Sequence, residues 1–172
     1  MKKNIILVFL VILFIPFSGY TQSNSEKTNT TTYILIRHSE KNLSDTTNKN
    51  PNLTEKGTKR SENIARTLID VPIDYVFSTN YNRTLQTAAP ISKSKNVETL
   101  LYNPKDLYNE EFKKLTKGKT TVIVGHSNTT PKFVNKIIKE DKYQNLDEKE
   151  YSKLFIIKIT QNIITDMVLH IE

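Results

Sequence analysis

The fold of this chain is indicated first by the stretch YILIRH, residues 33–38. Four apolar residues follow a run of threonines, and the stretch ends in an arginine and a histidine. A short run that is apolar throughout is typical of a strand covered on both faces of its sheet. In open α/β sheets, ligands bind at the carboxyl ends of the strands. Arg37 and His38 therefore stand where such a protein carries out its chemistry.

The same pattern returns at residues 121–126, TVIVGH, where a second apolar run ends in His126. Between the two, residues 73–77 are predicted to form another strand, and Arg83 falls in the first turn of the helix expected after it. Strands that alternate with helices predict a parallel sheet whose strand carboxyl ends lie at one edge. If the strands that end at Arg37 and Gly125 are neighbours, we expect both arginines and both histidines to share one crevice.

The remaining pattern predicts an α/β fold, a three-layer sandwich whose mostly parallel central sheet is flanked by helices and completed by a C-terminal antiparallel hairpin. Helices are expected from the cap Thr54 to residue 69, from about Tyr81 through Pro90, and over 106–115 and 132–139, with a weaker strand at 97–101. Pro90 either kinks its helix or marks a misplaced boundary. The hairpin arms are residues 154–159 and 163–171, and alternation in the second arm puts Ile163, Met167 and Leu169 on one face and Asp166 and His170 on the solvent face.

The length of 172 residues fits one domain. We expect a signal peptide at 1–21, a flexible lead-in at 22–32 and the domain at 33–172, because a basic start and an apolar run at 5–17 precede small and polar residues. The alternative is an uncleaved amino-terminal anchor. Export from a bacterial cytoplasm, to the periplasm or the medium and without membrane anchorage after cleavage, is the expected localisation.

The composition of the chain excludes several kinds of site and several classes of protein. The chain has no cysteine, which excludes disulfides, thiolate metal sites, thiol nucleophiles and lipoprotein attachment. The net charge of +7 comes from lysines scattered along the chain, whereas nucleic-acid binding would favour a basic stripe with interleaved aromatics. We therefore expect no nucleic-acid partner, although the positive field favours an anionic substrate.

Two histidines and two arginines in one crevice are unfavourable unless an anion joins them, so at least one imidazole should be neutral. A neutral imidazole is a nucleophile, and a guanidinium holds phosphate in a bidentate manner. Each motif alone is weak, but all three occur in order, each just past an apolar run. Together they predict phosphoryl transfer through a covalent histidine.

These residues resemble the histidine phosphatase superfamily, the phosphoglycerate-mutase-like proteins, in a compact form without a large cap. The run RHSE at 37–40 is similar to the family's Arg-His-Gly-Glu signature, and LTEKG at 53–57 to its Leu-Ser/Thr-x-x-Gly. STNYNRTLQTA at 78–88 resembles its arginine segment, and GHSN at 125–128 resembles its second histidine motif.

The resemblance implies that His38 attacks phosphorus and becomes phosphohistidine, while Arg37, Arg83 and His126 hold the phosphoryl oxygens, with no metal and no cofactor. The other ring nitrogen of His38 is expected to donate to a backbone carbonyl. Ser39 replaces the family's glycine and either points away or donates to phosphate, and Ser127 is a further phosphate-binding candidate. The family's general acid is unplaced here, and Asp106 is the nearest candidate.

The expected function is a phosphatase that acts on phosphomonoesters or phosphoramidates, either small or exposed on a larger molecule. The alternatives are a non-catalytic phospho-ligand binding module and a phosphoglycerate-mutase-type phosphotransferase. Residues 42–52, residues 103–107 and Lys132 are expected to rim the pocket. Neither the substrate nor the oligomeric state is indicated by the sequence.

Overall fold

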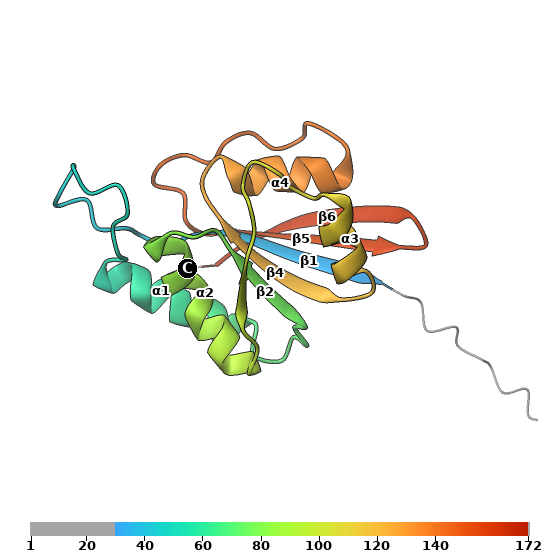
Figure 1. Ribbon diagram of the computed structural model, residues 1–172, viewed down its shortest axis with the longest axis horizontal. Helices are drawn as coiled ribbons and strands as arrows, with labels where there is room; N and C mark the ends of the chain where they lie inside the picture. Colours follow the sequence, from blue (N-terminus) through green and yellow to red (C-terminus); the bar gives the residue numbers. More distant parts are fainter. Residues whose placement is uncertain (1–29, 172) are drawn as a thin grey trace, which may run out of the picture.

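The computed structural model describes residues 30–171, and the predicted signal peptide lies outside this range. The chain forms a six-stranded sheet with four helices (Figure 1). The elements are β1 Thr31–Arg37, α1 Glu55–Thr67, β2 Tyr75–Ser78, α2 Asn82–Lys95, β3 Thr99–Leu101, α3 Glu110–Thr116, β4 Thr120–Gly125, α4 Thr129–Ile138, β5 Lys153–Thr160 and β6 Ile163–His170.

The strand order is β3-β2-β4-β1-β5-β6. The first four strands run parallel, while β5 and β6 form the antiparallel hairpin. Helices α1 and α2 cover one face of the sheet, and α3 and α4 cover the other (Figure 1). The predicted three-layer α/β fold is confirmed.

The central strand β1 explains the two-sided core. Tyr33 and Leu35 pack with the aromatic residues of α3 and α4, whereas Ile34 and Ile36 pack with the apolar side chains of α1 and α2. Successive strand residues point to opposite faces, so four consecutive apolar residues supply both cores. Since none of these four is more than 3% exposed, β1 is fixed from both sides up to its last residues.

Helices α1 and α2 begin as predicted. The Thr54 side chain caps α1 by accepting a hydrogen bond from the Gly57 amide. Helix α2 continues through Pro90 to Lys95, so the proline is no boundary, and the helix ends at Asn96 in the left-handed conformation. Arg83 thus lies in the first turn of α2.

Other boundaries differ from prediction. β1 begins at Thr31, inside the expected lead-in, because Thr32 already pairs with β4 and β5. α3 begins at Glu110 rather than at residue 106, because Tyr108 takes a positive φ of 54° and the Asn109 side chain caps the helix. α4 begins at Thr129, three residues before the expected start.

Some predicted apolar faces are also wrong. Ile69 and Leu115 are exposed. In β6, Val168 opposes Phe155 and packs against the core, whereas Met167, on the opposite face, is exposed together with Ile163 and Leu169. No helix covers this side of the hairpin, so alternation identified the two faces but not the covered one (Figure 1).

Among residues 30–171, no helix combines the length and apolar composition needed to cross a lipid bilayer.

Candidate active site

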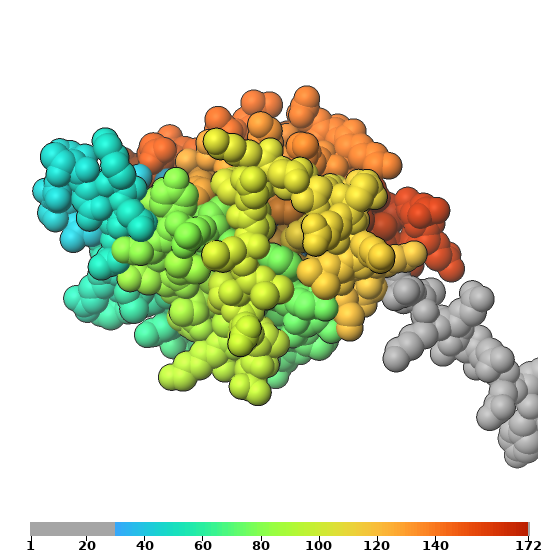
Figure 2. All heavy atoms as spheres, viewed as in Figure 1, coloured from blue at the N-terminus to red at the C-terminus, as the bar shows by residue number. Residues whose placement is uncertain are grey.

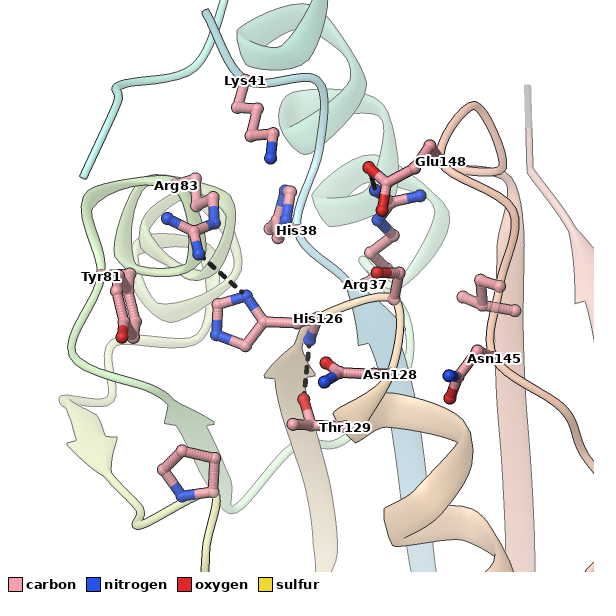
Figure 3. Close-up of a pocket in the computed structure, with 13 residues that line it drawn as sticks. Arg37, His38, Lys41, Tyr81, Arg83, His126, Asn128, Thr129, Asn145 and Glu148 are labelled. Atoms are coloured by element: carbon pink, nitrogen blue, oxygen red, sulfur yellow. Dashed lines mark hydrogen bonds and ion pairs between the residues drawn. The ribbon is translucent and has the colours of Figure 1, made fainter. Parts of the chain in front are cut away.

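The strand register brings the two histidines together. β1 and β4 are parallel neighbours, and Arg37 lies opposite Gly125. His38 and His126, the next residue of each chain segment, therefore leave the same edge of the sheet, with their ring centroids 5.5 Å apart. They line a cavity of about 540 Å³ with Arg37, Lys41, Tyr81, Arg83, Pro104, Ser127, Asn128, Thr129, Asn145, Leu146 and Glu148 (Figure 3).

His38 is held in one tautomer. Its Nδ1 donates to the Ser39 carbonyl oxygen at 2.7 Å, as expected from the sequence, and this leaves the Nε2 lone pair free. The ring is only 3% exposed. Burial, aided by the positive charges of Arg37 and Arg83, lowers the pKa of His38 from 6.5 to about 3, although the hydrogen bond to the Ser39 carbonyl acts in the opposite direction. His38 is therefore neutral at physiological pH, the form in which imidazole is nucleophilic.

His126 is oriented by hydroxyl groups at the start of α2. The Thr84 hydroxyl donates to backbone carbonyls, so in its contact with Thr79 it is the acceptor and the Thr79 hydroxyl is the donor. Because the Thr79 proton is used in this way, the Thr79 oxygen accepts from His126 Nε2 at 2.9 Å. Its Nδ1 lies 3.4 Å from an Arg83 Nη2 (Figure 3). Burial, and then the charge of Arg83, lowers the pKa of His126 to about 4. This ring is therefore also neutral before an anion binds.

Both arginines have unused donors. Arg37 is 2% exposed, and its Nη1 donates to the carbonyl oxygens of Asp147 and Glu150 at 2.7 and 2.9 Å. Its buried Nε has no partner among the described residues, and the Nε of Arg83 is equally buried and unpartnered. His38 lies between the two guanidinium groups (Figure 3). Buried donors beside two fixed positive charges are satisfied by an anion such as a phosphoryl group.

The segment after His38 is anchored on α1. The Glu40 carbonyl accepts from the Thr54 amide at 2.9 Å, and the Glu40 carboxylate accepts from Arg60 at 3.0 Å. Gly57 packs so closely that a Cβ atom there would overlap the Glu40 carbonyl oxygen. Glycine at this position therefore lets the helix and the segment after His38 meet.

The structure places most of the predicted site residues in one cavity. Arg37, His38, Arg83, His126 and Ser127 all line it. Ser39 does not: it is 1% exposed, and its Oγ is buried without a partner. A phosphate contact of Ser39 is thus unsupported, and its alternative, pointing away from the cavity, fits the structure.

The prediction that Asp106 lies at this cavity is wrong. It lines a separate hollow beside α3, where its carboxylate accepts from Asn109 Nδ2 at 2.8 Å. The reason is the turn at 103–109, which directs the chain into α3. Of the expected rim, only Pro104 lines the cavity, while residues 42–52 project outward at one end of the molecule (Figure 2).

Sequence reasoning missed a group of cavity residues. Lys41, Tyr81, Asn145, Leu146 and Glu148 line the cavity, and Thr79 orients His126. Tyr81 and Thr79 lie inside the arginine motif at residues 78–88 and could have been considered as site residues. The segment that carries Glu148 follows α4 without any periodic pattern, so nothing in the sequence indicated that it returns to the site.

Together these residues form an anion site around a neutral histidine with a free Nε2, the arrangement required for covalent phosphoryl transfer. Residues 33–104 match the sequence model of the histidine phosphatase superfamily (branch 1). The resemblance to this superfamily is thereby confirmed over that segment. Among curated proteins, no sequence matches the chain.

Solved structures show the same fold at low sequence identity. The protein histidine phosphatase SixA complexed with tungstate has 14% identity and a TM-score of 0.65, covering 81% of this chain and 96% of that one. Phosphoglycerate mutase from Bacillus anthracis has 14% identity and a TM-score of 0.64, with coverage of 83% and 93%. A phosphoserine phosphatase mutant from Entamoeba histolytica has 14% identity and a TM-score of 0.61, with coverage of 79% and 94%.

Proposed function

We propose that this protein is a phosphatase that hydrolyses phosphomonoesters, or phosphoramidates, through a phosphohistidine formed on His38. The observation that carries the proposal is the 2.7 Å hydrogen bond from His38 Nδ1 to the Ser39 carbonyl. It leaves Nε2 unprotonated in a cavity where two arginines have buried, unpaired Nε donors. Nucleophile and anion holders are thus present together before substrate arrives.

In the first step, the Nε2 lone pair of His38 attacks phosphorus, and the bond from phosphorus to the leaving oxygen or nitrogen breaks. Arg37 and Arg83 hold the phosphoryl oxygens with their free Nε groups and so stabilise the charge of the transition state. Water then attacks the phosphohistidine and returns the electron pair to Nε2. The two guanidinium groups supply positive charge that many phosphoryl transferases take from magnesium.

His126 holds phosphate only after it gains a proton. Its Nε2 donates to Thr79, so Nδ1 is an acceptor in the neutral ring. A phosphoryl oxygen needs a donor, and a bound dianion favours the imidazolium form. We therefore expect phosphate binding to be accompanied by protonation of His126, which would then donate through Nδ1.

Similar structures support a substrate with a phosphoryl group that is small or exposed. The relatives include a protein histidine phosphatase and a phosphoserine phosphatase, named for a phosphorylated side chain and a phosphorylated amino acid. The cavity here lies at the carboxyl ends of the strands, and residues 42–52 do not line it. Substrates in this proposal are phosphorylated small molecules or accessible phosphoryl groups on larger ones.

The test is to trap the intermediate. Protein quenched during turnover of a ³²P-labelled aryl phosphate should carry label that is stable to base and labile to acid, as phosphohistidine is. His38→Ala should abolish both label and phosphate release, whereas His170→Ala, an exposed surface histidine, should leave both unchanged. Saturable phosphate binding without label would instead identify a binding module, and transfer to an acceptor rather than to water would identify a phosphotransferase.

A further inference from the structure

One carboxylate lines the cavity. Of the side chains that surround it, only Glu148 is acidic, and its Oε2 lies 3.4 Å from Arg37 Nη2 (Figure 3). The glutamate is 76% exposed while the arginine is 2% exposed, so the carboxylate stands at the solvent side of the buried guanidinium. Glu148 therefore lies between the phosphate holder and the solvent from which water enters.

The position of Glu148 is set by backbone contacts. Asp147 and Glu150 lie on either side of Glu148 in the same turn. The carbonyl oxygens of both residues accept from Arg37 Nη1. The Glu150 amide donates to the Asp147 carbonyl at 3.0 Å and closes the turn, and the Leu146 amide donates to the Ser127 carbonyl at 2.9 Å. The turn is thus tied both to Arg37 and to the segment after His126, so it presents its middle residue to the cavity.

The proposed reaction leaves two proton transfers without a residue. An alkyl or phenyl leaving oxygen must be protonated as its bond to phosphorus breaks, and the attacking water must later lose a proton. His38 is bonded to phosphorus, and His126 uses its Nδ1 proton to hold a phosphoryl oxygen while its Nε2 donates to Thr79. Arg37 and Arg83 cannot be deprotonated. The other ionisable side chains at the cavity, Lys41 and Tyr81, carry no carboxyl group. A carboxyl group performs both transfers readily.

We propose that Glu148 is the general acid and general base of this site, an inference that rests on the proposed phosphatase function. In the first step, the Glu148 carboxyl gives its proton to the leaving oxygen as the phosphorus–oxygen bond breaks, which yields an alcohol, a phosphohistidine and a carboxylate. In the second, the carboxylate takes a proton from water as the water oxygen bonds to phosphorus and the phosphorus–nitrogen bond breaks. Phosphate leaves, and Glu148 is protonated again.

Binding of the substrate prepares Glu148 for this role. In the empty cavity the carboxylate is paired with Arg37. A phosphoryl group offers that guanidinium two oxygens and more charge, so it replaces the carboxylate as the partner. The Glu148 carboxyl is then released from Arg37 beside the bound phosphoryl group.

The test compares leaving groups in Glu148→Gln. For phenyl phosphate, whose leaving group needs a proton, kcat/KM should fall roughly 100-fold or more. For 2,4-dinitrophenyl phosphate, which needs no acid, kcat/KM should change by only about threefold, because the loss of general acid catalysis is confined to leaving groups that require it. With this second substrate the labelled phosphoenzyme should accumulate, since the base for its hydrolysis is missing. Glu140→Gln is the matched control: it removes the same charge by the same substitution, but Glu140 is exposed after the end of α4 and does not line the cavity, so both substrates should behave as with the unaltered protein.

Two outcomes would overturn the assignment. An equal loss of kcat/KM for both substrates would mean that Glu148 only positions Arg37, and unchanged kinetics would mean that it has no part in proton transfer. Label trapped from 2,4-dinitrophenyl phosphate shows that Glu148→Gln has kept a folded site. If the unaltered protein forms no phosphohistidine at all, the proposed function itself has failed, a result distinct from either of these.

Discussion

Acid should destabilise the phosphate-free protein through His38, and the magnitude follows from its burial. The unfolded chain binds this proton below pH 6.5, whereas folded His38 stays neutral down to about pH 3. Between these values the unfolded state holds more protons, so the free energy of unfolding falls as the pH falls. At pH 5, which is 1.5 units below 6.5, the loss is about 2 kcal/mol at roughly 1.36 kcal/mol per unit.

The assay is urea unfolding at pH 7.5, 6 and 5, with the free energy of unfolding compared between the unaltered protein and His38→Gln. The variant should lose about 2 kcal/mol less than the unaltered protein between pH 7.5 and 5. Carboxylates titrate in both proteins, so their contribution cancels in this comparison. His126, whose pKa is lowered to about 4, acts in the same direction in both proteins.

His170→Gln is the control, because this histidine lies on the exposed edge strand β6, and its curve should parallel that of the unaltered protein. Parallel curves for His38→Gln and the unaltered protein would refute the reasoning. Such a result would mean that His38 gains its proton as easily in the folded protein as in the unfolded chain, and the claim of a neutral buried nucleophile would fall with it.

Three further changes test the supports of the site. Thr79→Val removes the acceptor of His126 Nε2, so it should lower the free energy of unfolding by about 1–3 kcal/mol in urea unfolding and weaken the binding of vanadate, measured as inhibition. Unchanged inhibition would contradict the role of the Thr84 and Thr79 hydroxyls in orienting His126. Gly57→Ala forces the Glu40 backbone away and should cost about 1–3 kcal/mol of stability together with a loss of kcat, and wild-type values for both would disprove the close packing. Arg37→Lys cannot replace two backbone hydrogen bonds and a phosphate contact at once, so kcat/KM for aryl phosphates should fall roughly 100-fold; a loss below about threefold would exclude this double role.

Prediction from sequence succeeded for the residues that directly follow the ends of parallel strands. Residues 33–38 and 121–126 are apolar runs whose direction is fixed by a parallel sheet, so His38 and His126 were expected at the same sheet edge. They meet there because β1 and β4 are neighbouring strands. The prediction failed for Asp106, which lies in the irregular turn before α3 and accepts there from Asn109, the residue after the left-handed backbone at Tyr108. That conformation is uncommon for tyrosine, and no sequence pattern indicates it.

The route of the chain after α4 was equally unpredictable. Glu148 lies in a segment with no apolar periodicity, and its place is set by hydrogen bonds from Arg37 to backbone carbonyls, which any residue offers. In β6 the alternation was correct, but which face is covered depends on where the helices stop. Local sequence patterns therefore predicted the helices and strands, whereas the contacts between segments far apart in the sequence are known only from the structure.

The hydrogen bond from Arg37 to the Asp147 carbonyl spans 110 residues. An amino-terminal fragment, including the segment 33–104 that carries the family's sequence pattern, has the nucleophile but lacks the carbonyls that fix its arginine. During synthesis, this anion site can therefore be completed only after residues 147–150 have emerged and docked against Arg37.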